Sequence, residues 1–194
     1  MTDAVDQDLI CAIATPPGQG GIGIVRLSGP GAKRVAEKIC ARGLVSRKAV
    51  YCEFKNAAER LDDGVALWFP APNSFTGEEV VELQGHGGPV VQQQILNALC
   101  SLGARLAKPG EFSERAFHNG KLDLAQAEAV ADLISSTSIA AARAAVNTLR
   151  GDFSNKVNDL IERITTLRVQ VEAAIDFPEE ELEIEMVVDN GCMD

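Results

Sequence analysis

One acidic side chain within a short apolar strand is the residue of this sequence best suited to bind a small molecule. Glu82 lies in the stretch NSFTGEEVVELQGHGGP, residues 73–89. A carboxylate on such a strand is costly to bury unless a donor pairs with it. A Gly/His turn predicted at residues 85–88 would let a ligand approach the backbone, and Pro89 then opens a helix with free N–H groups. The pattern fits equally well an alternating strand on which Glu82 faces water.

A second candidate is Arg26, in the strand-like run of residues 24–27. An arginine that points inward there needs an anion or a carbonyl partner, whereas one that points outward is a solvated charge.

Residues 18–23 match GxGxxG, but the dinucleotide fingerprint requires a helix at the third glycine, and here a strand that stops at Pro30 follows. We therefore reject dinucleotide binding. We expect a loop that approaches a ligand or another subunit, or else a plain hairpin loop.

The remaining reactive side chains point to no enzyme on their own. His86 lies in an HGG segment typical of oxyanion turns, but the sequence contains no GxSxG nucleophile elbow, so we reject a hydrolase. Glu111 and Glu114 are spaced for one helical face, where we expect solvated or capping roles. The five cysteines are scattered without a CxxC, which predicts free thiols in a reducing cytoplasm, no zinc site and no disulfide framework. We assign no catalytic residue and no metal site.

Composition limits the class of protein. The 194 residues are 46% hydrophobic and 24% charged, typical of a globular domain with or without a helical extension. No apolar run is long enough to span a bilayer, and the acidic start lacks the pattern of a signal peptide. Residues 119–194 hold 6 basic and 15 acidic side chains, against 12 and 13 in residues 1–118. Since neither part is basic, we expect another domain or protein to supply much of the binding to any RNA substrate.

The elements that position these residues form two parts. Residues 1–118 predict an α/β domain with a mixed β-sheet, residues 119–178 a partial helical domain of three helices, and residues 179–194 an acidic tail or linker. The expected strands are residues 9–14, 24–27, 50–54, 65–69 and 79–84, with a polar turn at 61–64 and the run 65–69 covered on both faces. The expected helices are residues 32–41, 89–102, 122–134 and 139–149, and a long one from 152 to Pro178.

The long helix carries an apolar stripe that recurs at threes and fours from Phe153 to Ile175. The two shorter helices are too small to cover all of it. We expect a missing part of a helical bundle, or a second chain, to supply the partner.

Four blocks of sequence share one resemblance. They are residues 14–29, 71–91, 108–134 and 171–181, which read ATPPGQGGIGIVRLSG, APNSFTGEEVVELQGHGGPVV, KPGEFSERAFHNGKLDLAQAEAVADLI and VEAAIDFPEEE. These motifs are long and specific, and they closely resemble the N-terminal part of the MnmE, or TrmE, family of tRNA-modification GTPases. The resemblance runs from about residue 8 to about residue 183.

The resemblance implies a fold, a cofactor and partners. The family has an N-terminal tetrahydrofolate-binding domain that also forms a homodimer and is similar to the folate domain of aminomethyltransferases. A helical domain follows, interrupted by a potassium-dependent G domain that binds GTP and magnesium. With an FAD-dependent partner, MnmG or GidA, the cytoplasmic family modifies the wobble uridine of tRNA. The folate, as a 5-formyl or methylene derivative, is thought to carry the added one-carbon unit.

The family's folate contacts fall on Arg26, Glu82 and Lys121 of this sequence. A pterin presents an adjacent ring N–H and amino group, and the Glu82 carboxylate can accept hydrogen bonds from both. Arg26 and Lys121 can bind the pterin carbonyl, a formyl oxygen or the folate's glutamate tail. The resemblance therefore favours Glu82 as a ligand-binding residue over a solvated one.

Three departures from the family pattern limit what is implied. Gln19 stands where the family usually has arginine, which weakens an anion site in that loop. The sequence after about residue 183 no longer resembles the family. No GxxxxGK[ST] occurs, and the family's C-terminal catalytic cysteine motif is absent, with Cys192 a coincidence. We expect an N-terminal portion or a truncated product that does not hydrolyse GTP.

Two hypotheses follow. The first is the folate-binding, dimerising portion of a GTPase that adds a carboxymethylaminomethyl group to wobble uridine. The second is a non-catalytic module that dimerises and docks the partner without folate. A standalone folate-dependent aminomethyltransferase is disfavoured because the helical segment resembles the GTPase family.

Overall fold

The structure, a computed structural model, describes residues 8–176. Its strands are β1 (Ile10–Ile13), β2 (Gly20–Ser28), β3 (Val50–Asn56), β4 (Glu59–Phe69), β5 (Val80–Gly87) and β6 (Arg105–Leu106). Its helices are α1 (Ala32–Cys40), α2 (Pro89–Ser101), α3 (Glu111–His118), α4 (Leu124–Ser135), α5 (Ile139–Leu149) and α6 (Asp152–Asp176). Within this part of the chain, no helix has the length and apolar character needed to cross a membrane. The predicted mixed sheet with helices, followed by a helical segment, is confirmed.

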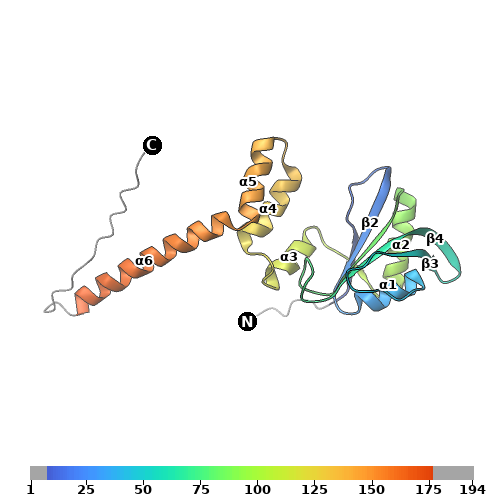
Figure 1. Cartoon of the computed structure of the whole chain (residues 1–194), viewed down its shortest axis with the longest axis horizontal. Coiled ribbons are helices and arrows are strands. Elements are labelled where there is room, and N and C mark those ends of the chain that lie inside the picture. Colours follow the sequence, from blue (N-terminus) through green and yellow to red (C-terminus); the bar gives the residue numbers. More distant parts are fainter. Residues whose placement is uncertain (1–7, 177–194) are drawn as a thin grey trace.

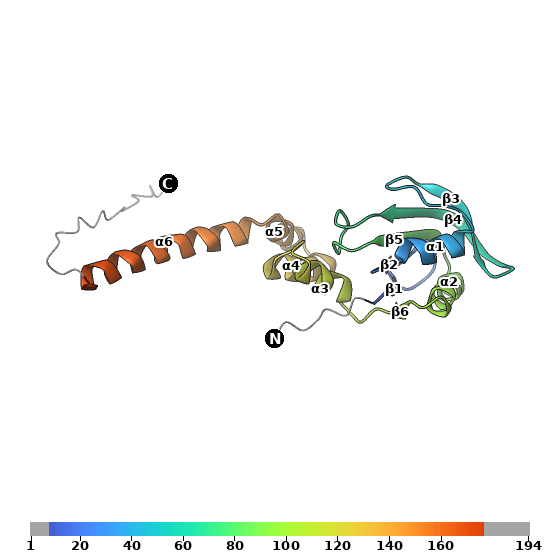
Figure 2. The same cartoon turned by 90° about the horizontal axis from the view of Figure 1, so that it is seen from below.

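Six strands form one sheet in the order β3-β4-β5-β2-β1-β6. The β1–β6 pair is parallel and the other four pairs are antiparallel. Helices α1 and α2 lie on the same side of this sheet (Figure 2), and their apolar residues join those of the strands in one core. Helices α3 to α6 lead away from the sheet in chain order (Figure 1).

Side-chain alternation decides which residues of the central strands reach the core. Val25 and Leu27 of β2 and Leu83 of β5 are buried in the core under α1 and α2. Because successive side chains of a strand point to opposite faces, Arg26 and Glu82 lie on the other face of the sheet. Helices α1 and α2 do not cover that face, and the residues that approach Arg26 there are Phe75, from the loop before β5, and Phe112 of α3.

The turn predicted at residues 85–88 is wrong, since β5 continues to Gly87. Gly85 and Gly87 pair with Gly23 and Gly20 of β2. A Cβ on Gly87 would collide with the backbone oxygen of Gly20, so glycine is what allows the strands to come together. β2 therefore starts before the predicted residue 24, and a strand, not a helix, contains the third glycine of GxGxxG, as the rejection of dinucleotide binding requires.

The polar turn predicted at residues 61–64 is also wrong. These residues belong to β4, and the chain turns at Ala57 and Ala58, with Ala57 at a φ of 53°. Asp62 fits within the sheet because its carboxylate accepts the backbone N–H of His86 at 2.7 Å. The run 65–69 is not covered on both faces: only Ala66 is fully buried, because α1 and α2 cover one face alone.

Helices α1 and α2 match their predicted ranges closely. α1 buries the expected apolar residues, and Pro89 occupies the first turn of α2. An apolar stripe along α2 would place Val90 inward, but Val90 is 72% exposed. Gln92 is buried instead, and its side-chain oxygen accepts a hydrogen bond from the Thr15 hydroxyl at 3.1 Å. This bond satisfies a buried polar group that an apolar-stripe argument does not anticipate.

Capping residues set the starts of the next two helices. α4 begins at Leu124 rather than Leu122 because Asp123 forms a capping box with Gln126. Of the two serines before α5 that suit a cap, Ser136 and Ser138, it is Ser138 that caps the helix, accepting the N–H of Ala141. The apolar spacing of α4 favours Leu124 and Ile134 on a buried stripe, but both are exposed, since α4 packs mainly against α5 along its other residues.

α6 projects from the rest of the chain as a single helix (Figure 1). Its large apolar side chains from Phe153 to Ile175 are exposed, and none of the other described elements covers them along the length of the helix. The predicted stop at Pro178, the acidic tail of residues 179–194 and Cys192 lie outside the described residues. The other four cysteines, Cys11, Cys40, Cys52 and Cys100, are free thiols.

Candidate functional site

Arg26 of β2 and Glu82 of β5 are direct cross-strand neighbours. The guanidinium donates from Nε and Nη2 to Oε1 of Glu82 at 3.0 and 2.7 Å. Their side chains are 28% and 15% exposed. The structure thus joins two residues that the sequence marked separately. The arginine supplies the partner that a half-buried carboxylate needs, and Glu82 does not face open water.

Two aromatic rings lie next to this ion pair. The central guanidinium carbon of Arg26 is 5.5 Å from the ring centre of Phe75 and 5.7 Å from that of Phe112. Phe75 belongs to the loop between β4 and β5, and Phe112 belongs to α3. A planar cation over aromatic faces is attracted by their negative faces, so the rings hold the guanidinium in place.

Lys121 follows α3 and is exposed. A Cβ on Gly77 would lie 3.1 Å from Lys121 Cγ, so the lysine stem passes close to this glycine, whose φ is 79°. Gly77 lies two residues from Phe75, and the same loop therefore links Lys121 to the Arg26–Glu82 pair. Lys121 itself makes no hydrogen bond or ion pair with Arg26 or Glu82, all three being among residues 8–176.

A second group of charges, which we call the Arg115 cluster, lies where α3 meets the sheet. Its members are Asp8, Glu78, Arg105, Glu111 and Arg115. The Arg115 side chain is 3% exposed and lies 2.5 Å from Asp8, 3.2 Å from Glu78 and 3.0 Å from Glu111. Buried guanidinium groups require such pairing. The cluster fixes α3, and with it Phe112, against the sheet.

Most of the Arg115 cluster has no signal in the sequence. The solvated role expected for Glu111 is wrong, because Glu111 is 5% exposed and bonds both arginines. The expected capping role is not seen either, because Glu111 accepts the N–H of Lys108, which precedes the helix, at 2.6 Å, and no side chain caps α3. The spacing of Glu111 and Arg115 by four residues was the one local signal. The partners Asp8 and Glu78 are 107 and 37 residues from Arg115 in sequence, where no local pattern reaches.

Hydrogen bonds from arginine lower the pKa values of two carboxyls in the Arg115 cluster. The bond from Arg105, with a further one from Arg115, lowers the pKa of Asp8 to about 2. The bond from Arg105, helped by the Lys108 N–H and Arg115, lowers the pKa of Glu111 to about 2. Both groups are therefore charged at any physiological pH.

His86 forms a third pair, on β5 beyond Glu82. Its ring Nδ1 lies 2.7 Å from Oδ1 of Asp62, whose Oδ2 accepts the His86 backbone N–H. The His86 side chain is 72% exposed. The hydrogen bond to Asp62 raises the pKa of His86. His86 and Gly87 of the HGG segment belong to β5, and Gly88 precedes α2.

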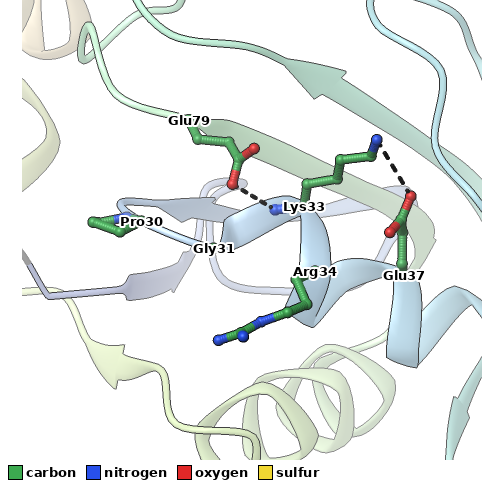
Figure 3. A pocket seen from close by; sticks show the side chains of 6 residues that line it. All are labelled: Pro30, Gly31, Lys33, Arg34, Glu37 and Glu79. Carbon is green, nitrogen blue, oxygen red and sulfur yellow. Dashed lines mark hydrogen bonds and ion pairs between the residues drawn. The ribbon is translucent and has the colours of Figure 1, made fainter.

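Two surface hollows lie away from the predicted residues. One, of about 540 Å³, is lined by Pro30, Gly31, Lys33, Arg34, Glu37 and Glu79 (Figure 3). Glu79 accepts the N–H of Lys33 at the start of α1, and the Lys33 ammonium pairs with Glu37. The other, of about 400 Å³, lies between α4 and α6. Since the charges of the first are largely matched internally, it offers no better site than the Arg26–Glu82 pair.

Comparison with known proteins gives matches over nearly the whole chain. Residues 9–121 match the family described as GTP-binding protein TrmE N-terminus, and residues 124–190 match the MnmE helical domain. A protein of Marinomonas sp., named tRNA modification GTPase MnmE, is 58% identical over 187 residues, which cover 94% of this chain and 41% of the relative. A protein of the same name from Chromohalobacter salexigens is 59% identical over 178 residues, covering 91% and 39%. The chain thus spans about two fifths of the length of these relatives.

Proposed function

This chain belongs to the TrmE N-terminus family of MnmE tRNA modification GTPases, and from that premise we propose that it binds a reduced folate through Arg26, Glu82 and Lys121. The observation that carries the proposal is the Arg26–Glu82 pair on the face of the sheet that α1 and α2 leave free. A carboxylate there can accept the two adjacent donors of a pterin, while the aromatic rings of Phe75 and Phe112 suit a flat ligand.

The arginine and the lysine complete the recognition. A folate carries a ring carbonyl at one end and glutamate carboxylates at the other, and both are acceptors for cationic donors. Arg26 is beside Glu82, so it suits the ring end. The stem of Lys121 lies beside Gly77, a residue of the loop 70–79. Lys121 therefore suits an oxygen of the ligand that is more distant from the ring. Because Lys121 is exposed and its stem is flexible, it can reach a ligand without a change in the backbone.

The wider activity belongs to the complete protein. The folate is a 5-formyl or methylene derivative, and it supplies the one-carbon unit for a carboxymethylaminomethyl group on wobble uridine. GTP, magnesium and potassium bind a G domain that lies outside this sequence, and an FAD-dependent MnmG-like partner joins the reaction in the cytoplasm. These expectations follow from the family alone, and the acidic balance of the chain favours tRNA contact through the complex.

Calorimetric titration with 5-formyl-tetrahydrofolate tests the proposal. We expect micromolar binding to the wild-type chain and loss of binding in Glu82→Gln, which keeps the side-chain shape but places a donor where two donors must be accepted. Lys121→Ala should weaken binding without abolishing it. Glu59→Gln, a change at an exposed carboxylate of β4, is the matched control and should bind as the wild type does. A wild-type chain that gives no heat at millimolar ligand rules the proposal out.

A second function, a docking module that does not bind folate, is favoured by one observation. Arg26 already neutralises Glu82, so the pair needs no ligand to satisfy its charges. On this alternative the pair is a structural cross-strand contact. The same titration separates the two functions, because a docking module shows no heat with folate in any variant.

The family also implies a homodimer formed by the α/β domain. Light scattering coupled to gel filtration measures this directly. At tens of micromolar chain we expect the mass of two copies, and we expect it to persist when α6 is made polar by Leu160→Gln and Leu167→Gln. A monomeric mass for the wild type would contradict the dimer, and a monomeric mass for the double variant alone would place the interface on α6 instead.

A further inference from the structure

The Arg26 guanidinium and Glu82 leave little room for a ligand as they stand. Oε1 of Glu82 receives two N–H donors from Arg26, at 3.0 and 2.7 Å. Oε2 receives a weaker hydrogen bond from the side-chain amide of Gln84, at 3.3 Å. A carboxylate has about four acceptor sites in all. Three are used, so a ligand with two adjacent donors finds only one acceptor site free.

The group that blocks Glu82 is chemically similar to the proposed ligand. The amino-pyrimidinone edge of a pterin is a cyclic acylguanidine: it is flat, and it presents a ring N–H beside an exocyclic amino group. The Arg26 guanidinium is also flat and also presents two neighbouring N–H groups to Glu82. Both groups stack on aromatic faces, and Arg26 already lies over Phe75 and Phe112.

We propose that Arg26 is an internal placeholder, whose guanidinium occupies the subsite for a flat guanidine-like ring formed by Glu82, Phe75 and Phe112. The proposal deepens the folate function and rests on it. A ligand ring enters by taking the Glu82 carboxylate and the two aromatic faces in exchange for the guanidinium. Phe75 and Phe112 are then ligand-binding residues, a role that neither the family resemblance nor the sequence pattern assigned.

The surroundings of Arg26 permit this exchange. Its side chain is 28% exposed, so the guanidinium can swing toward water at small cost, whereas Arg115 at 3% exposure cannot. Each of its contacts is replaceable: the incoming ring supplies both donors to Glu82 and a flat surface to the phenyl rings. The displaced guanidinium remains near the ligand, where it can donate to the ring carbonyl. Binding is thus a competition, and the measured affinity is the intrinsic affinity multiplied by the fraction of chains in which Arg26 has left the subsite.

Methylguanidinium and free pterin test the placeholder in the intact chain. Arg26→Ala empties the subsite while retaining Glu82, Phe75 and Phe112. We expect this variant to bind methylguanidinium, measured by calorimetry or by NMR shifts of the Phe112 ring, and the wild type not to bind it. Pterin should bind Arg26→Ala at least about tenfold more tightly than the wild type, because the competitor for Glu82 is gone and this gain exceeds the loss of one exposed hydrogen bond from the displaced guanidinium to the ring carbonyl. Adding methylguanidinium should then weaken pterin binding to the variant.

Controls separate the subsite from unspecific binding. Arg26→Ala with Glu82→Gln removes the acceptor and should lose methylguanidinium, and Arg26→Ala with Phe112→Leu should bind it several-fold more weakly. Arg34→Ala removes an exposed arginine of α1 and should behave as the wild type. If Arg26→Ala does not fold, Arg26→Val, with a strand-forming side chain, replaces it in every measurement.

Two results would overturn the placeholder. One is a folded Arg26 variant that binds no methylguanidinium. The other is a variant that binds pterin less tightly than the wild type does, since Arg26 would then be a fixed part of the site. The methylguanidinium measurement involves no folate. A wild-type chain that fails to bind 5-formyl-tetrahydrofolate therefore removes the proposed function without deciding this result.

Discussion

Two arginines of this chain pair with carboxylates in opposite ways. Arg115 is buried, and its guanidinium bonds Asp8, Glu78 and Glu111 together with the backbone oxygen of Asp8. Arg26 is half-open, and among the described residues it bonds one carboxylate, that of Glu82, with two aromatic rings beside it. The first joins elements that are distant in the chain. The second lies between neighbouring strands that are already joined by backbone hydrogen bonds.

The difference separates a structural ion cluster from a candidate ligand site. Nothing can replace the partners of Arg115 without leaving a buried charge unpaired. The partners of Arg26 can be exchanged for ligand groups, because water reaches the pair and the strands hold without it. The Arg115 cluster serves the site indirectly, since it fixes α3 and so places Phe112 over Arg26.

The largest expected effect concerns stability. Arg115→Ala leaves Glu78 and Glu111 without their buried partner and should lower the free energy of unfolding by about 3–5 kcal/mol. Arg26→Ala should cost only about 1 kcal/mol, because its pair is partly exposed. Urea unfolding followed by circular dichroism measures both, with Arg34→Ala as a control expected within about 0.5 kcal/mol of the wild type. Equal losses for Arg115 and Arg26 would erase the distinction between the two arginines.

A smaller effect appears on acidification. The pKa values of Asp8 and Glu111 fall from ordinary values of 3.8 and 4.5 to about 2 in the folded chain. Both carboxyls therefore stabilise the folded chain above pH 4.5, and this contribution disappears as the pH falls from 4.5 toward 2. Urea midpoints measured across that range should fall steeply for the wild type. Glu111→Gln should be less stable at neutral pH and should show a shallower fall, and parallel curves would exclude Glu111 as a source.

The smallest effect concerns the His86–Asp62 pair, in which the His86 side chain is 72% exposed. Asp62 raises the pKa of His86, so the pair stabilises the folded chain below pH 6.5 and this contribution disappears as the pH rises through the folded-state pKa. An NMR titration of the ring proton should place the midpoint of His86 above 6.5. Asp62→Asn should return it toward that ordinary value. A midpoint that the substitution leaves unchanged would show that Asp62 does not act on the ring.

Much of the fold follows from local pattern. The apolar periods of α1 and α6 and the antiparallel β1–β2 pair were predictable, because each depends on residues close in sequence. The glycines of β5 led to the wrong prediction of a turn at residues 85–88, because glycine is typical both of turns and of a close approach of two strands. That distinction depends on β2, which lies some sixty residues earlier.

The two charged residues of the candidate site were predictable one by one, but their arrangement and the aromatic residues beside them were not. Glu82 and Arg26 stand out as charges in apolar strands, yet the pairing of β2 with β5 that joins them is a long-range contact with no sequence period. Phe75 and Phe112 gave no signal, because an aromatic residue in a loop or short helix is ordinarily core. The Arg115 cluster combines residues up to 107 apart, and only folding brings them together.

The most direct test of the account observes both arginines during one titration. The side-chain Nε–H signals of Arg26 and Arg115 can be followed by NMR as 5-formyl-tetrahydrofolate is added. We predict that the Arg26 signal shifts in a saturable manner, as its bond to Glu82 is exchanged for the ligand, while the Arg115 signal stays in place. An Arg26 signal that does not move at saturating folate, or that moves only together with that of Arg115, would contradict the assignment of the Arg26–Glu82 pair as the ligand site.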